Sequence, residues 1–519
     1  MEYKDDIGPD GPLTIKIRLD LPPPSENDQT ADLERLLRGL EGHGLAEVQT
    51  PLSVAADIPG VLRRSGFKVA ATIGFTPVPR LVRVEPIDTA SRNLGLAVDL
   101  GSTNIVCMLI ALDSGETLGE TSGLNPQVMH GEDILTRIHY CLEKGHIEEL
   151  QAEAAGSING MAERLAAEAG AGPGDLTCVS VSGNTTMVHM FLGLDPYHLC
   201  RAPYIPAANR FPIMRAKELG LHVAEEALVY VLPNVGSFVG GDALAGVLVS
   251  GMHLRDEISL MVDVGTNAEI VVGGRDFLLA GAGSAGPGLE GGVVSHGMRA
   301  MPGAIERVSI DPVSLDPEYS VIGGLAPSGM CGSALIDLMA GLFINGIIDG
   351  RGRFAEPARS GRVREFEGLS CYVVVYAEKS ATGRDIVLTE SDIDNLMMSK
   401  AAMYTMLNVI TRKAGVGFEE LSAFYIAGAF GGYIAADKAV AIGMVPDIEL
   451  SKYRPIGNSS LKGAALTLLS RSNISEVERV AGLMTYMEMN VSTEFMDEYM
   501  AAKFLPHTDS SLFPSVRKV

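Results

Sequence analysis

The chain has 519 residues, of which 46% are apolar and 20% charged, values close to those of ordinary globular domains, so extensive disorder and coiled coil are excluded. The formal net charge of −23 disfavours binding to nucleic acids or anionic membranes, because both require a basic face. No apolar stretch reaches the roughly 18 residues of a membrane span, and the polar, acidic residues 1–12 are not expected to act as a signal peptide.

Cysteine and histidine spacing argues against a sequence-encoded metal motif. The six cysteines show no C-x-x-C pair, so we expect reduced core thiols in a cytoplasmic protein and no zinc ribbon or ferredoxin-type cluster. The ten histidines contain no H-E-x-x-H, and Gly145 weakens a shared helix for His139 and His146, so a histidine metal site is not expected. His189 is expected to be a hydrogen-bonded core residue.

The predicted elements begin with a small α+β domain over residues 13–88, preceded by a linker or disordered segment at 1–12. Apolar and polar residues alternate over 13–20, which predicts a strand. The helical apolar period predicts helices at 32–40 and 53–64, and strands are predicted at 67–73 and 81–84.

Strands and helices alternate from residue 94 onward, which predicts an α/β architecture. We expect a first lobe at 94–257, a second at 258–505 and a tail at 506–519. The predicted elements of the lobes are strands at 94–100, 105–112, 228–231, 258–264, 268–274 and 423–426, a strand–turn–helix over 176–193, and helices at 133–142, 157–169, 239–250 and 334–343.

A sequence repeat relates the two lobes. Asp99-Leu100-Gly101-Ser102-Thr103-Asn104 recurs as Asp263-Val264-Gly265-Thr266-Asn267, 263 − 99 = 164 positions later, and each copy lies between two predicted strands. Such a duplication predicts two lobes with pseudo-twofold symmetry.

The repeated turn combines groups that bind phosphate and magnesium. Glycine lets backbone N–H groups approach an anion, serine or threonine adds a hydroxyl donor, and the aspartate suits Mg²⁺ directly or through water. Two facing hairpins would clamp the phosphates of one nucleotide, unlike a P-loop, whose motif is absent. A single copy is also explained by a tight hairpin without a ligand, but two copies in matched contexts favour nucleotide binding.

Two further glycine-rich segments are candidate ligand contacts. Gly428 and Gly431 follow a buried strand and would let a flat base lie against the backbone, or would form a strand–helix packing turn. Gly286 and Glu290 would place backbone and a carboxylate beside a ligand, or would belong to a glycine-rich loop without one.

A third candidate is the start of a helix at Gly332 and Ser333. Helix N-termini favour anions. Ser333 as an ordinary N-cap is an equally good interpretation.

The motifs resemble those of the actin-like ATPase superfamily, which includes acetate and sugar kinases, heat-shock chaperones and actin. Residues 99–103, 263–267 and 427–431 are similar to its first phosphate, second phosphate and adenosine motifs. Longer strings resemble, more narrowly, the ATP-dependent reductive activators of corrinoid enzymes over roughly residues 13–505, and the small first domain is similar to that family's middle domain. These strings are Leu124-Asn125-Pro126-Gln127, Ser182-Gly183-Asn184-Thr185-Thr186-Met187, Val239-Gly240-Gly241-Asp242 and Ile456-Gly457-Asn458-Ser459-Ser460.

The resemblance implies a duplicated, ribonuclease H-like, two-lobed ATPase fold. It also implies that ATP hydrolysis drives an electron onto cob(II)alamin in a corrinoid protein of a methyltransferase system, which returns the cobalt to the cob(I) state.

For the site, the resemblance implies that Asp99 and Asp263 position Mg²⁺ and that the two hairpins hold phosphate. Asp242 would orient the attacking water, or would be a helix N-terminal residue favoured by the dipole. Gly428 and Gly431 would contact the nucleoside.

The sequence departs from this family in its cysteines, because family members carry a cysteine-ligated iron–sulfur cluster in an N-terminal ferredoxin domain or at the C-terminus. No cysteine precedes Cys107 or follows Cys371, so no cluster is expected in this chain. The chain would then be a fragment, would use a separate ferredoxin-type donor, or would have another role. The rival functions are a small-molecule kinase and a non-catalytic nucleotide-sensing scaffold, and homodimer formation is left open.

Overall fold

The protein is represented by a computed structural model that describes residues 10–90, 92–265, 267–284, 286, 288, 292–355, 360–428, 434–488 and 493–516. The chain divides into two compact units. The first runs to Val249 and takes in Ser459–Leu483, and the second contains Ser250–Asn458 and the chain from Met484 onward. Within the described ranges, no helix has the length and apolar character needed to cross a membrane.

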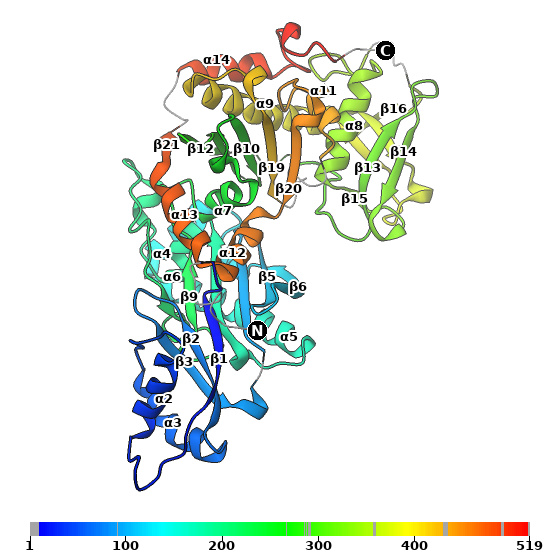
Figure 1. Ribbon diagram of the computed structural model, residues 1–519. Helices are drawn as coiled ribbons and strands as arrows, with labels where there is room; N and C mark the ends of the chain where they lie inside the picture. Colours follow the sequence, from blue (N-terminus) through cyan, green and yellow to red (C-terminus); the bar gives the residue numbers. More distant parts are fainter. Residues whose placement is uncertain are drawn as a thin grey trace. The chain divides into compact units, whose positions relative to one another are not determined.

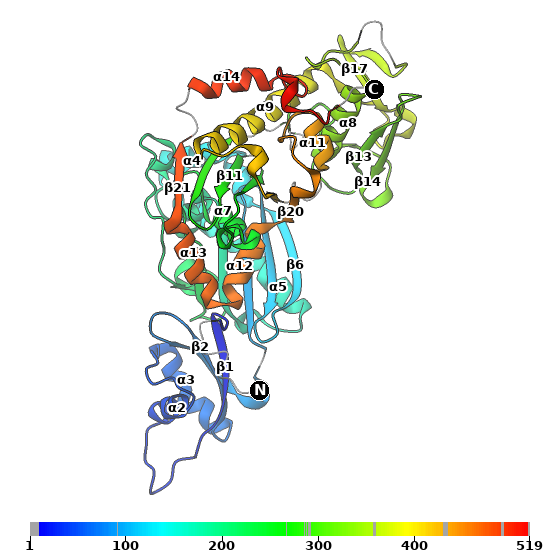
Figure 2. The same cartoon turned by 45° about the horizontal axis from the view of Figure 1, so that its top comes forward.

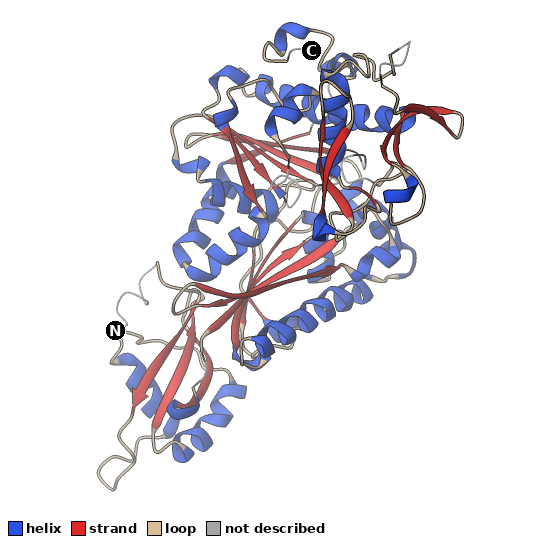
Figure 3. Ribbon diagram, turned by 90° about the vertical axis from the view of Figure 1, so that its right-hand side faces the viewer, coloured by secondary structure: helices blue, strands red, loops and turns tan. Residues whose placement is uncertain are grey.

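The first unit begins with the predicted small α+β domain. Its antiparallel sheet has the order β1-β2-β3, and Figure 3 shows these three strands with their helices next to the N-terminal end. Apolar side chains of the sheet and of both helices share one core, so the alternating and helical patterns are confirmed. The elements are β1 (Thr14–Asp20), α2 (Asp32–Glu41), α3 (Leu52–Arg64), β2 (Lys68–Gly74) and β3 (Arg80–Pro86).

The first lobe is a mixed six-stranded sheet of order β6-β5-β4-β7-β9-β8, covered by helices (Figure 1). Strands β4, β5 and β6 are antiparallel, whereas β4, β7 and β9 run parallel. The strands are β4 (Leu94–Leu100), β5 (Asn104–Ala111), β6 (Glu116–Leu124), β7 (Leu176–Gly183), β8 (Met214–Arg215) and β9 (Leu228–Val231). The helices are α4 (Ile134–Lys144), α5 (Ile147–Glu168), α6 (Thr185–Leu192), α7 (Gly241–Ser250), α12 (Ser459–Leu469) and α13 (Arg471–Leu483).

The long helix α5 lies against β5 and β6 (Figure 2). It begins at Ile147, well before the predicted start at residue 157. Leu150 and Ala154 are buried in its first turns at helical spacing. Gly156 interrupts the pattern, because glycine disfavours a helix, and the predicted helix therefore begins only after it.

The central strand β4 presents two different faces, because successive side chains of a strand point to opposite sides. Leu96 and Val98 lie in the core that contains α5. The other face carries the small residues Gly95 and Ala97 and then Asp99. A Cβ atom at Gly95 would lie 3.3 Å from the Leu468 side chain of α12, so the small residues let this helix pack closely on the sheet.

The packing of α12 also changes the domain assignment. We predicted a second lobe over 258–505, but α12 and α13 belong to the first unit. The reason is that α12 contacts β4 and β7, where Ser180 Oγ lies 2.7 Å from Thr467 Oγ1 in the buried interior.

Five strands of the second unit repeat the sheet arrangement of the first lobe, and the sixth strand of each sheet lies at the opposite edge. The strand order in the second unit is β20-β19-β10-β11-β12-β21, with β10 antiparallel to β11 and parallel to β19. The second repeat motif therefore joins a hairpin whose first strand is central, as in the first lobe. The strands are β10 (Ser259–Val264), β11 (Asn267–Gly273), β12 (Leu278–Ser284), β19 (Ala423–Ala427), β20 (Tyr453–Gly457) and β21 (Met484–Glu488).

Two small sheets and four helices complete the described part of this unit. The helix α14 lies along α9 in Figures 1 and 2. The sheets are β14-β13-β15 and β16-β17-β18. Their bounds are β13 (Ala304–Ile310), β14 (Pro317–Val321), β15 (Gly329–Met330), β16 (Val363–Phe366), β17 (Leu369–Val375) and β18 (Ile386–Thr389); the helices are α8 (Gly332–Ile344), α9 (Glu390–Lys413), α11 (Ala436–Ala441) and α14 (Thr493–Ala502).

A buried lysine on α9 holds the chain that follows α14. Lys400 is 0% exposed, and its Nζ donates to the carbonyl oxygens of Phe504 and Pro506 at 2.6 Å each and of Gly443 at 3.4 Å. Burial lowers the pKa of Lys400 well below its usual value. The amino group can donate three hydrogen bonds, and the three carbonyl oxygens accept them. A polar group can be buried at low cost only when its donors are paired in this way.

The contact between α12 and α7 gives a testable prediction. A Cβ atom at Gly463 would lie 2.4 Å from Ala245 Cβ, so Gly463→Ala should force the two helices apart and destabilise the protein by ~1–3 kcal/mol. Gly156→Ala, on α5, is the matched control because a Cβ there meets nothing within 4 Å, and it should be neutral or stabilise by up to ~1 kcal/mol. Urea unfolding would measure both, and equal effects would contradict the packing argument.

Candidate functional site

The first repeat motif forms the hairpin between β4 and β5. A Cβ atom at Gly101 would lie 2.4 Å from the carbonyl oxygen of Asn104, so the turn requires glycine. Asn125 holds the hairpin from outside, because its Nδ2 donates to the Gly101 carbonyl at 2.9 Å and its backbone N–H to the Thr103 carbonyl at 2.8 Å. The segment from Gly101 to Thr103 is partly exposed and Asn104 is exposed, so the turn is both fixed in shape and accessible.

The Asp99 carboxylate is oriented by a residue from α12. The Ser460 hydroxyl donates to Asp99 Oδ1 at 2.7 Å and lies 3.0 Å from the Ser182 hydroxyl. Asp99 and Ser182 are register partners on the parallel strands β4 and β7, which places both side chains on the α12 face of the sheet. Ser182 and Ser460 are buried, so this contact fixes the aspartate at the carboxyl end of the strand.

A second carboxylate lies at the start of α7. A Cβ atom at Gly240 would lie 2.6 Å from the Gly183 carbonyl oxygen, which shows how closely this helix start approaches the end of β7. Burial raises the pKa of Asp242 to about 6, opposed by backbone N–H donors such as that of Ala243, and the nearby Asp99 carboxylate raises it further. Two carboxylates in one partly buried place form a site that a cation or a proton would stabilise.

The second repeat motif places Asp263 at the end of β10. The Gly265 backbone N–H donates to the Asn267 carbonyl at 2.9 Å, which closes the hairpin. Gly428 has a φ of +88°, and a Cβ atom there would lie 2.7 Å from Asp263 Oδ1. The structure thus brings Asp263 and Gly428 together. Thr266, like Gly431, lies outside the described residues.

The remaining predicted contacts have other surroundings. Gly286 lies against Ser399 of α9 and lines a cavity of about 290 Å³. Glu290 lies outside the described residues.

Gly332 and Ser333 begin α8 inside the protein. Ser333 is 3% exposed, and its hydroxyl donates to the Glu306 carbonyl at 2.8 Å. The N-cap residue is Cys331, so the N-cap interpretation of Ser333 is wrong. The Ser333 hydroxyl is used for a hydrogen bond inside the protein. We therefore do not propose Gly332 and Ser333 as ligand contacts.

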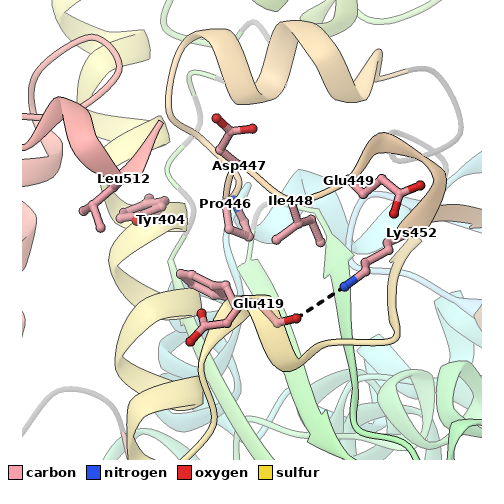
Figure 4. Close-up of a pocket in the computed structure, with 9 residues that line it drawn as sticks. Tyr404, Glu419, Pro446, Asp447, Ile448, Glu449, Lys452 and Leu512 are labelled. Atoms are coloured by element: carbon pink, nitrogen blue, oxygen red, sulfur yellow. Dashed lines mark hydrogen bonds between the residues drawn. The ribbon is translucent and has the colours of Figure 1, made fainter. Parts of the chain in front are cut away.

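Figure 4 shows a cavity of about 320 Å³ in the second unit. Tyr404, Asp447 and Glu449 line it, and Lys452 donates to the Glu419 carbonyl at 3.4 Å. No predicted site residue lines this cavity.

Sequence reasoning missed the residues that position the site. Asn125, Ser182 and Ser460 occur in the strings that carried the family resemblance, but neither spacing nor residue type indicated that they would hold Asp99 and its hairpin. His189 is confirmed as a core residue, because its Nδ1 lies 2.7 Å from the Thr185 carbonyl and its Nε2 accepts from the Ala207 N–H. The six cysteines are unpaired thiols.

Three family models match consecutive parts of the chain. They are described as the RACo linker region, over residues 9–91, the RACo middle region, over 94–255, and the C-terminal domain of RACo, the ASKHA domain, over 257–517. The small domain that we likened to the family's middle domain therefore matches the linker region instead.

Individual relatives carry related descriptions. The corrinoid activation enzyme RamQ of Eubacterium limosum is 33% identical over 414 residues, which cover 78% of this chain and 69% of that protein. A Co(II) methylated amine-specific corrinoid protein reductase of Methanosarcina barkeri is 24% identical over 440 residues, covering 78% of this chain and 76% of that protein.

A solved structure described as a reductive activator for corrinoid, iron-sulfur protein matches with a TM-score of 0.90 and 39% identity, covering 98% of this chain and 82% of its own. This match and the ASKHA family model confirm the predicted actin-like α/β fold.

The raised pKa of Asp242 predicts a pH-dependent stability difference. A carboxyl whose pKa rises from 3.8 to about 6 on folding contributes stability that is present below pH 3.8 and lost as the pH rises through about 6. Asp242→Asn should therefore unfold like the wild type near pH 4 and be more stable by ~1–3 kcal/mol at pH 7. Asp57→Asn, at an exposed position, is the control; a pH-independent difference for Asp242→Asn would contradict the assignment.

Proposed function

Because this chain belongs to the RACo family, we propose that it is an ATP-dependent reductive activator of a corrinoid protein. The observation that carries this proposal is the match over 98% of the chain to a reductive activator for a corrinoid, iron–sulfur protein. The reaction adds one electron to cobalt, converting cob(II)alamin to cob(I)alamin, while ATP is hydrolysed to ADP and phosphate.

The two hairpins are the proposed phosphate-binding elements. Backbone N–H groups and hydroxyls of Gly101–Asn104 would hold one part of the triphosphate, and those of Gly265–Asn267 another. The fixed shape of the first hairpin supports this role, because phosphoryl transfer is catalysed mainly by positioning and charge stabilisation.

The carboxylates fit a magnesium ion. Mg²⁺ prefers oxygen ligands and keeps several waters, and the raised pKa of Asp242 beside Asp99 indicates a place where positive charge would be stabilised. We assign Asp99 and Asp263 to hold the ion directly or through water. Bound there, the ion would neutralise charge on the transferring phosphate.

Asp242 is the proposed residue that orients the attacking water. Its pKa of about 6 leaves it ionised at neutral pH and able to accept a hydrogen bond from water. Gly428 and Gly431 are assigned to the nucleoside. Gly428 has a φ of +88°, a backbone conformation that favours glycine. Glycine is therefore needed at this position whether or not a nucleoside is bound.

The proposed partner is a corrinoid protein of a methyltransferase system in the cytoplasm. The electron would come from a ferredoxin-type donor, because the six cysteines of this sequence offer no cluster-binding spacing. We propose that the cysteines present here do not ligate the donating cluster. Burial raises the pKa values of Cys107 and Cys178 to about 12, which disfavours the thiolate form that a cluster requires.

The full chain can be tested with a corrinoid protein held as cob(II)alamin, a reduced ferredoxin and Mg-ATP. We expect the cob(I) absorption spectrum to appear with ATP and to be absent with ADP, and ATP turnover to rise when the corrinoid protein is added. Equal spectra with ATP and ADP would refute the proposal. A phosphorylated small molecule would identify a kinase instead, and tight ATP binding without turnover would identify a sensor.

The proposed carboxylates predict loss of turnover with the fold intact. Asp99→Asn and Asp263→Asn should each lower ATP turnover by about 10²–10³-fold, by analogy with the loss of one preorganised electrostatic contact. Asp276→Asn is the matched control, because this exposed residue lies between β11 and β12 of the same sheet as Asp263. Circular dichroism would verify folding, and wild-type turnover in either variant would remove that residue from the site.

A further inference from the structure

A compact histidine–glutamate cluster lies in the first unit, on elements that follow the first hairpin. His130 Nε2 lies 2.8 Å from Glu153 Oε1, and His146 Nδ1 lies 2.9 Å from Glu149 Oε2. The Tyr140 hydroxyl donates to Glu149 Oε2 at 2.7 Å. No residue of this cluster is among those assigned to nucleotide binding.

The local fold explains why these side chains meet. His130 ends the 3-10 helix η2 (Pro126–His130), and His146 precedes α5. Glu149 and Glu153 are four residues apart on α5, so they lie on one face of the helix. Tyr140 of α4 stacks between the imidazoles, with ring centroids 4.3 Å from His130 and 4.5 Å from His146.

The donor atoms have the spacing of a metal site. One ligand atom each from His130, Glu149 and Glu153 lies within 4.8 Å of the others, and the 2.8 Å contact of the first and third is a hydrogen bond that a bound ion would replace. Glu153 Oε2 is buried and has no hydrogen-bond partner among the described residues. A buried carboxylate oxygen without a partner is costly, and a cation would remove that cost.

We propose that His130, Glu149 and Glu153 bind one divalent transition-metal ion of the Zn²⁺ class. An imidazole with two carboxylates suits Zn²⁺ and similar ions, whereas Mg²⁺ and Ca²⁺ prefer oxygen ligands alone. Tyr140 acts on the ion through Glu149, because its hydroxyl orients that carboxylate. His130 and Glu153 are half-buried and Glu149 is exposed, which leaves access for the ion and for water ligands.

The position of the cluster gives the ion a structural role. Gln127 Nε2 donates to the Leu150 carbonyl at 2.7 Å, so one hydrogen bond already links η2 to α5. A metal ion bound by His130, Glu149 and Glu153 would add a second link between these two elements. Since η2 directly follows Asn125, which holds the hairpin at Gly101, the ion would stabilise the support of that hairpin.

The test is independent of corrinoid chemistry. Full-length protein treated with a chelator and kept free of nucleotide would be titrated with Zn²⁺ by calorimetry and with Co²⁺ by visible absorption. We expect one high-affinity ion per chain and a higher Tm with Zn²⁺. Glu153→Gln and His130→Gln should lose this binding, and Tyr140→Phe should weaken it about 10–100-fold, as removal of an outer-shell partner does.

Two control variants separate this site from others. Glu148→Gln changes the same charge on an exposed neighbour in α5 and should bind Zn²⁺ like the wild type, as should Asp99→Asn. Absence of binding by the wild type would overturn the proposal and leave a hydrogen-bonded cluster only. Wild-type affinity in folded Glu153→Gln and His130→Gln proteins would overturn it as well.

Discussion

The close approach of α12 to the small-residue face of β4 is the constraint on which the geometry of Asp99 and its hairpin depends. Gly95 and Ala97 leave room for the helix, and Asp99 follows on the same face of the strand. Because α12 lies this close, Ser460 reaches Asp99 Oδ1 at 2.7 Å. A larger side chain at Gly95 would move the helix and with it the hydroxyl that orients the carboxylate. Packing of apolar residues thus determines the geometry of a charged group.

The second unit reaches a similar arrangement with a different neighbour. Asp263 also ends a central strand that is parallel on one side and antiparallel on the other. Its neighbour is Gly428, which directly follows the adjacent parallel strand β19 and whose missing side chain leaves the Asp263 carboxylate room. The two copies of the motif therefore share the turn but differ in the residue that touches the aspartate.

The sequence allows prediction of features that depend on local residue patterns, but not of contacts that depend on how distant segments pack together. The repeated Asp–Gly turns, the buried strands and His189 follow from residue type and spacing. Ser460 lies 361 positions from Asp99, so only the folded sheet shows that they meet. Ser333 was a reasonable anion contact by position, but its hydroxyl donates to Glu306. The cluster of His130, Glu149 and Glu153 has no recognisable motif, because His130 of η2 meets the two glutamates of α5 only in the folded chain.

The pair of Asp99 and Asp242 connects charge binding with the protonation of the proposed water-orienting group. Asp242 has a raised pKa because it is buried and because Asp99 is negatively charged. Positive charge placed at Asp99 would offset that repulsion, and the pKa of Asp242 would fall toward its ordinary value. Asp242 would then be ionised over a wider pH range when the nucleotide site is loaded than when it is not. In this way, a cation bound at Asp99 would favour the ionised form of Asp242, which is the form that can orient water.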